Sequence, residues 1–260
     1  MAATLDVIFA RHISIRIYGL SAVVLGLVGL VWGDYAVVLQ PAPDSVPGQT
    51  ALGYAVAVPF LLAGLALQWQ RAAGPSALAL TVLYSLGSIF FDLPQVIAHP
   101  SVFVNWEGAA ETLALVAGGL VAYAYCAQLE PATAERLSKL GRLLFGVCLI
   151  VFGLAHLFYL AYTATLVPAW LPPSQISWVY VTAAAFFAAA AAILSGIAAR
   201  LAAMLLTAMF VVFAVLVHAP TILFHPHIHF NWVENAINFA LIGSAWVIAA
   251  SVPAVRKSKA

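Results

Sequence analysis

The sequence has few charged residues and few cysteines, and each shortage excludes a class of protein. Only 7% of its 260 residues are charged, whereas soluble domains contain about 25%. A soluble fold of this length would lack the charges to cover its surface, but a membrane protein is surrounded by lipid. The net charge of +1 gives no reason to expect a nucleic-acid partner. With 65% hydrophobic residues, the chain is expected to have the lipid bilayer as its main partner.

The two cysteines, Cys126 and Cys148, lie far apart and form no C-x-x-C motif. Membrane thiol oxidoreductases exchange disulfides through a paired dithiol, so the spacing argues against that chemistry. We expect both to be small buried hydrophobic residues.

Apolar runs dominate what is present, and eight of them have about the 20 residues that a helix needs to cross a bilayer. Prolines and glycines such as Pro41, Pro43 and Gly74 separate them. No signal-peptide cleavage site precedes the first run, so we expect it to stay in the membrane. The sequence predicts an all-α, polytopic membrane protein with eight transmembrane helices. The runs cover residues 17–39, 51–69, 76–95, 105–127, 142–166, 176–197, 201–220 and 231–251.

Basic residues mark one side of the membrane. All ten lie in the termini or in the even-numbered loops between the predicted helices, and the odd-numbered loops contain none. By the positive-inside rule, both termini are expected in the cytoplasm, for a protein of the bacterial inner (plasma) membrane. The ten are Arg11, Arg16, Arg71, Arg136, Lys139, Arg142, Arg200, Arg256, Lys257 and Lys259.

The chain also contains an internal duplication. A shift of 126 residues places Pro94, His99-Pro100 and Asn105-Trp106 on Pro220, His225-Pro226 and Asn231-Trp232. We therefore expect two four-helix repeats, at 1–127 and 142–260, joined by a cytoplasmic linker at 128–141. Because four is even, the repeats insert in the same orientation.

Polar residues found in only one repeat are better candidates for function than shared ones. In the second repeat they form one face of the last predicted helix and a stripe on the fifth. Polar groups at membrane depth usually face a bundle interior or a wet cavity. We therefore predict a pocket in the second repeat, open to the outer face. Its residues are His156, Tyr159, Thr163, His218, Glu234, Asn235 and Asn238.

Helix caps are the structural alternative for some of these residues. Asn231 and Glu234 fit a capping box at the start of the last helix, and Asn105 fits an N-cap at the start of the fourth. The acidic residues Glu107 and Glu111 are interpreted as partners of that helix's dipole.

The loop before the last helix carries His225, His227 and His229. If this segment is extended, the three side chains point to one side and suit Zn(II) or Cu(II). The alternative is an interfacial loop whose histidines bond to water, lipid headgroups or carbonyls. A b-type haem held by His156 and His218 is disfavoured, because their positions differ in depth by about 12 Å at 1.5 Å per residue.

The four-helix unit, its glycine-rich first helix and the fifth helix with its exit, from Phe152-Gly-Leu-Ala-His156 to Pro168-x-Trp170-Leu-Pro172, together resemble the DoxX-like family of small bacterial membrane proteins. The likeness covers the second repeat best, although members are usually single four-helix units. It implies an all-helical inner-membrane protein, some members being linked to quinone or thiol redox partners. It transfers no catalytic residues.

Three functional classes remain. The favoured one is a redox-associated protein, linked to quinone or forming a membrane subunit of an oxidoreductase complex, since His156, Tyr159 and Glu234 offer hydrogen-bond donors and a proton route. The second is a binding or transport protein for copper, zinc or a small molecule. The third is a structural subunit with a membrane or periplasmic protein partner, in which the polar stripes join helices. Whether the protein is an enzyme stays open.

Overall fold

The structure, a computed structural model, describes residues 2–34 and 49–252, and the described residues are almost entirely helical. Pro41, Pro43, Arg256, Lys257 and Lys259 lie outside them. The helices are α1 (Ala2–Trp32), α2 (Gln49–Ala66), α3 (Gln70–Gly87), η1 (Ser88–Asp92), α4 (Leu93–Ala98), α5 (Phe103–Cys126), α6 (Pro131–Phe158), α7 (Leu160–Leu166), α8 (Gln175–Ser195), α9 (Ala199–Phe213), η2 (Ala214–His218), α10 (Ala219–Phe224) and α11 (His229–Ser251).

The all-helical prediction is confirmed, and seven of these helices or helix series are long and apolar enough to cross a membrane, among the residues described. The eighth predicted run is α2, whose apolar part, Thr50–Ala66, is shorter than the rest. The seven candidate spans are Ala10–Trp32, Gln70–Ala98, Phe103–Cys126, Pro131–Phe158, Gln175–Ser195, Ala199–Phe224 and His229–Ser251.

Local sequence explains several helix ends. Proline at the first position starts α6, where its missing N–H costs nothing. The Ser174 hydroxyl caps α8 by accepting a hydrogen bond from the Ser177 N–H at 3.2 Å. Gly196 ends the same helix with a φ of 78°, a left-handed conformation that glycine adopts without steric penalty.

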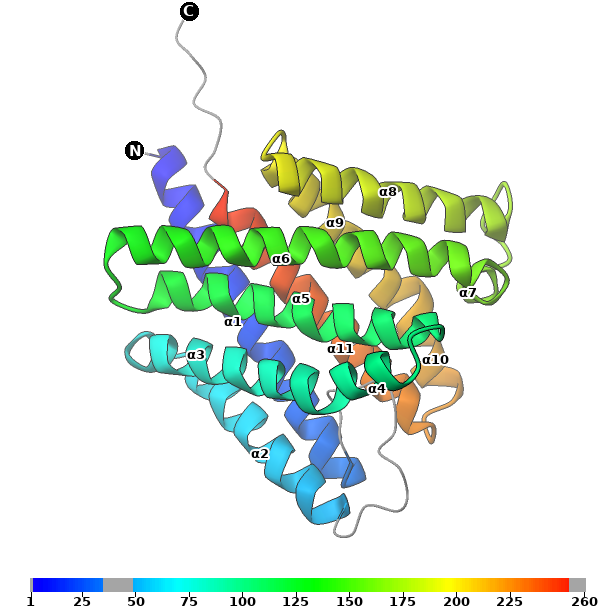
Figure 1. The fold of residues 1–260 in the computed structure, drawn as a ribbon, viewed down its shortest axis with the longest axis horizontal. Helices are drawn as coiled ribbons and strands as arrows, with labels where there is room; N and C mark the ends of the chain where they lie inside the picture. Colours follow the sequence, from blue (N-terminus) through cyan, green and yellow to red (C-terminus); the bar gives the residue numbers. More distant parts are fainter. Residues whose placement is uncertain (1, 35–48, 253–260) are drawn as a thin grey trace, which may run out of the picture.

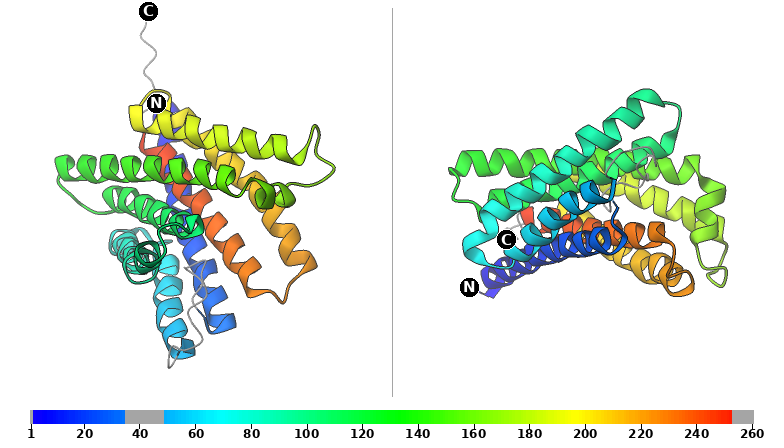
Figure 2. Two further views of the ribbon diagram at one scale, coloured as in Figure 1. Left: turned by 45° about the vertical axis from the view of Figure 1, so that its right-hand side comes forward. Right: turned by 90° about the horizontal axis from the view of Figure 1, so that it is seen from below.

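Successive connections alternate between two ends of the helices (Figure 1). The α2–α3, α5–α6 and α8–α9 connections lie toward the left or the top, on the side where α1 starts, whereas the α4–α5, α7–α8 and α10–α11 connections lie toward the right and lower right. Helix α11 packs against α1, α5 and α9, and α6 packs against α5 and α8 (Figure 2). The last helix is therefore surrounded by elements from both ends of the chain.

The surface of the protein is much more apolar than that of a soluble protein, and a few polar side chains are buried. Large apolar side chains such as Leu223 (77% exposed) and Phe224 (78% exposed) lie on the surface, while Asp92, Thr112 and Asn238 are buried. Soluble monomers rarely expose large contiguous apolar surface. The burial pattern therefore supports the assignment of a helical membrane protein.

The corners before α5 and α11 are held by the same contacts, 126 residues apart. The Asn105 amide donates to the carbonyls of Gln95 and His99, and Asn231 donates to those of Thr221 and His225. These residues close the end of the preceding helix, so the predicted N-caps and capping box are wrong. The reason is that α5 and α11 begin two residues before the asparagines, at Phe103 and His229.

A widened, π-helical turn precedes each corner. Residues 88–92 form η1 and residues 214–218 form η2. A π turn contains more residues than an α turn and is often found at functional sites. The two turns end at Asp92 and His218, two ionisable residues that are also 126 positions apart.

Candidate functional site

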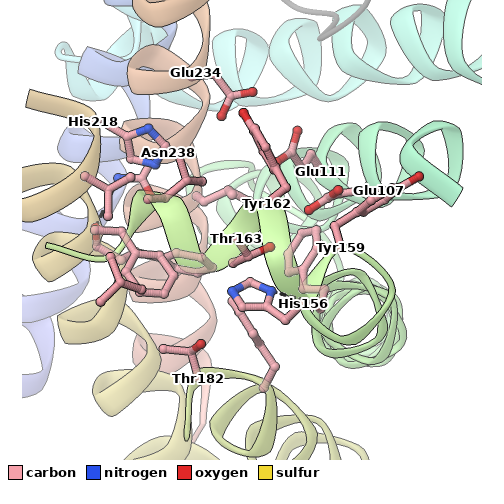
Figure 3. A pocket seen from close by; sticks show the side chains of 18 of the residues that line it. Glu107, Glu111, His156, Tyr159, Tyr162, Thr163, Thr182, His218, Glu234 and Asn238 are labelled. Carbon is pink, nitrogen blue, oxygen red and sulfur yellow. Dashed lines mark hydrogen bonds between the residues drawn. The ribbon is translucent and has the colours of Figure 1, made fainter. Parts of the chain in front are cut away.

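One cavity of about 550 Å³ lies among α5, α6, α7, α8, α9 and α11, toward the end that carries the α4–α5, α7–α8 and α10–α11 connections. Six of the seven predicted pocket residues line it (Figure 3). They are His156, Tyr159, Thr163, His218, Glu234 and Asn238. The seventh, Asn235, is half-buried on α11 but is absent from the lining.

Three carboxyl groups form the acidic part of the cavity. Glu107 and Glu111 come from successive turns of α5, and Glu234 comes from the second turn of α11. The Glu111 carboxyl lies close enough to those of Glu107, Glu234 and Asp92 to interact with them electrostatically. Figure 3 shows the three glutamates on the same side as Tyr162. One end of the cavity therefore concentrates negative charge, or the protons that neutralise it.

Phenylalanines form the apolar part of the wall. Phe186 from α8 makes contacts with Phe152 and Phe210, with ring centroids 5.6 Å and 5.9 Å away. Phe213 lies 6.4 Å from Phe186 and completes this cluster. Because the cluster is packed on itself, it presents a stable aromatic surface to whatever occupies the cavity.

His156 lies between the two parts. Its ring packs against Phe186 at 5.1 Å and stacks on Phe213 at 6.4 Å. Its Nδ1 lies 2.9 Å from the Phe152 carbonyl oxygen. A carbonyl can only accept, so Nδ1 carries a proton and Nε2 of the neutral ring remains an acceptor.

Tyr159 connects the two halves of the chain at the cavity. It lies at the break between α6 and α7, and its hydroxyl accepts a hydrogen bond of 2.8 Å from the Val104 N–H in the first turn of α5. Beside it, the Phe103 and Phe158 rings stack at 4.4 Å. These contacts hold the start of α5, and hence Glu107 and Glu111, against the second half.

His218 and Asn238 occupy the other side of the cavity from the glutamates (Figure 3). His218 ends η2, and Asn238 donates a 3.0 Å hydrogen bond to the Phe210 carbonyl. The N–H of Ala214, the first residue of η2, also donates to that carbonyl, so Asn238 supplies it with a second donor. Asn238 therefore has a structural role as well as a place in the cavity wall.

Glu107, Glu111, Tyr162 and Thr182 are the polar lining residues that sequence reasoning missed. The sequence interpretation gives these two glutamates a role at the helix dipole of α5, because it seeks functional residues among the polar residues of the second repeat. The sequence did contain a signal for them. They are spaced at i and i+4 in an apolar helix, and an ionisable residue at membrane depth is by default a functional candidate.

The predicted metal site is not formed. Residues 225–228 make a tight turn, closed by a 3.2 Å hydrogen bond from the Ile228 N–H to the His225 carbonyl, so the segment is not extended. His225 and His227 are exposed, and His229 instead packs on the Trp32 ring at 5.0 Å. Its Nδ1 lies 3.8 Å from an Asp34 carboxyl oxygen. Over residues 2–34 and 49–252, no group of three histidine, cysteine or acidic residues could hold a metal ion.

Both cysteines are free thiols. Cys148 is 2% exposed in the core, and Cys126 is half-buried at the end of α5. Neither lines the cavity.

Comparison with known families gives one match. A family described as a domain of unknown function (DUF8561) matches residues 145–249, from α6 to the last turns of α11. The matched stretch contains His156, His218 and Glu234 but not Glu107 or Glu111. Searches of curated proteins and of solved structures found no match. The chain is thus similar to this family over its second half, and the match carries no statement of activity.

Proposed function

We propose that this protein binds a small molecule with an apolar body and a polar head in the cavity between α5 and the second-half helices. The observation that carries the proposal is a cavity of about 550 Å³ whose lining combines three carboxyl groups with a phenylalanine cluster. Ligand pockets have volumes of about 300–1,000 Å³, with mostly apolar walls and a few convergent polar groups. A polar stripe that only joined helices would be packed against them, without enclosing such a volume.

Filling the cavity is expected to weaken binding by at least about tenfold, because a bulky side chain takes the ligand's place at a cost above 1.4 kcal/mol. The variant is Thr182→Trp, since Thr182 lines the wall and its hydroxyl bonds only to its own helix. Binding of 4-fluorobenzyl alcohol, which has an aromatic body and a hydroxyl head, can be followed by ¹⁹F NMR of the purified protein.

Thr207→Trp is the matched control. Thr207 is also half-buried and bonds to its own helix, but it does not line the cavity. Saturable binding to the wild type and to Thr207→Trp, lost in Thr182→Trp, is the expected pattern. Equal behaviour of all three proteins would refute the proposal.

A quinol is a second candidate ligand, favoured by the orientation of His156. With Nδ1 held by the Phe152 carbonyl, Nε2 can accept a hydrogen bond from a quinol hydroxyl, and the glutamates offer onward proton acceptors. A redox-associated function linked to quinone is therefore the second proposal.

His156→Phe is expected to weaken decylubiquinol binding about tenfold, the value of one hydrogen bond of about 1.4 kcal/mol. Phenylalanine preserves the packing against Phe186 and Phe213. Isothermal titration of the protein in nanodiscs measures the affinity, and His227→Phe, in the exposed turn, is the control. Identical affinities in the three proteins would exclude the quinol.

We also infer a tandem duplication, DoxX-like in type, inserted with the cavity at the outer face of a bacterial inner membrane. Two observations support the duplication: the matching asparagine contacts and the matching widened turns. Arg71, Arg136 and Arg200 lie within the first two turns of α3, α6 and α9, at the end away from the cavity. By the positive-inside rule that end is cytoplasmic.

A further inference from the structure

The charges around the cavity do not balance. Glu107, Glu111 and Glu234 line it, yet no lysine or arginine is among the lining residues. Along α6 the first basic residue before His156 is Arg142, about 21 Å away at 1.5 Å per residue. Arg11 stacks on Tyr125, which is about as far from Glu111 along α5. Among the residues that the structure describes, the three carboxyl groups therefore have no lysine or arginine partner.

Glu111 shows that the imbalance is not resolved by hydrogen bonds. Its Oε2 is inaccessible to solvent and has no hydrogen-bond partner among the residues that the structure describes. A buried polar atom without a partner carries a free-energy cost, and a buried ionised carboxylate without a counter-charge carries a much larger one. The site is thus complete only with protons or with a positive charge from outside the described chain.

The aromatic wall fits a positive charge as well. The ring faces of Phe, Tyr and Trp attract cations through their quadrupoles, and more strongly in a desolvated site. Tyr162 lines the cavity on the same side as the three glutamates (Figure 3), so its ring is available to a positive head there. Carboxylates and aromatic rings together are the chemistry that recognises amines and quaternary ammonium groups.

We propose that the ligand of this cavity is an organic cation with an apolar or aromatic body, and that it binds in exchange for protons on the cavity glutamates. The inference rests on the proposed small-molecule function and names its ligand class. The positive head lies against Glu107, Glu111 and Glu234, and the body lies against the phenylalanine cluster. Each cation that enters replaces a carboxyl proton, which leaves to solvent, so the charge of the site is unchanged.

Proton exchange makes binding depend on pH. The groups that face Glu111 are Glu107 on α5, Glu234 on α11 and Asp92 at the end of η1, and the other titratable side chains of the lining are His156, Tyr159, Tyr162 and His218. Raising the pH removes the competing protons, so cation affinity should rise by up to about tenfold per pH unit for a one-proton exchange.

Two probes of equal shape test the proposal on the full-length protein in detergent. Benzyltrimethylammonium carries a permanent charge, and neopentylbenzene is its neutral isostere. At pH 8 the charged probe should bind at least tenfold more tightly than the neutral isostere. This preference should become smaller as the pH is lowered. Glu111→Gln, which keeps the shape of the side chain, should remove most of the preference. The control Glu135→Gln alters an exposed glutamate near the start of α6 and should leave the preference unchanged.

The outcomes separate the two proposals. Equal binding of both probes, independent of pH and of Glu111→Gln, would overturn the cation inference and leave the small-molecule function standing. Absence of binding of either probe and of 4-fluorobenzyl alcohol would overturn both. If Glu111→Gln no longer unfolds cooperatively on heating, Glu234→Gln takes its place. This substitution removes a carboxyl group of the same acidic cluster, from α11.

Discussion

Gly243→Val is expected to lower the free energy of unfolding by about 3 kcal/mol, the upper range for overpacking a close contact. A Cβ at Gly243 on α11 would stand 2.7 Å from the Tyr18 Cα and 3.0 Å from its nitrogen on α1. Backbone atoms of a packed helix cannot move aside as a flexible side chain can. The two helices must separate, so thermal unfolding of the purified protein should occur at a markedly lower temperature.

The effect should spread because several elements meet at Tyr18. This side chain is fully buried, its hydroxyl donates a 2.8 Å hydrogen bond to the Leu115 carbonyl on α5, and its ring lies 6.2 Å from that of Tyr84 on α3. Ala191→Val, on the exposed face of α8, is the control and should change stability by less than about 0.5 kcal/mol. A Gly243→Val protein as stable as the control would show that α1 and α11 are not in this close contact.

Thr163→Lys is expected to weaken binding of benzyltrimethylammonium by about 100-fold or more. Thr163 lines the cavity on α7 (Figure 3), so the new ammonium group can pair with the glutamates and act as a tethered substitute for the ligand. A like charge placed against the probe costs several kcal/mol, and each 1.4 kcal/mol is about tenfold in affinity.

The control is Thr165→Lys, two residues further along α7 and exposed to solvent. It adds the same charge to the same helix outside the cavity, and it should leave the affinity nearly unchanged. The neutral isostere distinguishes charge from bulk, because steric blocking would weaken both probes to the same extent. Unaltered affinity of Thr163→Lys for the cation would contradict the charge assignment of the cavity.

The helical fold was predictable because apolar run length is a local property of the sequence. The asparagine corners were not, although both asparagines were noticed. Helix boundaries inferred from a pattern are uncertain by a few residues, and the true partners of Asn231 lie six and ten residues earlier. A contact of that kind depends on how the chain turns back at His225, which the local pattern does not specify.

The candidate site was predictable where its residues recur at helical spacing. Glu234 and Asn238 share one face of α11, and His156, Tyr159 and Thr163 keep that spacing although the helix breaks at Tyr159. To place Glu107 and Glu111 in the site, one must know that α5 packs against the helices of the second half. That information lies in tertiary contacts such as the Tyr159 bond to Val104 and the stacking of Phe103 on Phe158. The three-histidine metal site was predicted for an extended segment, whereas residues 225–228 make a tight turn that local sequence did not specify.

The widened turns η1 and η2 determine which way Asp92 and His218 face. Each π turn holds one residue more than an α turn, so it takes up an extra residue without rotating those that follow. If the same sequence were wound as an ordinary α-helix through residues 214–218, every later residue would be rotated by about 100° around the helix axis, the angle of one residue at 3.6 per turn. His218 would leave the cavity wall and Pro220 would no longer aim the chain at its corner. One widened turn therefore sets which way this end of the helix faces.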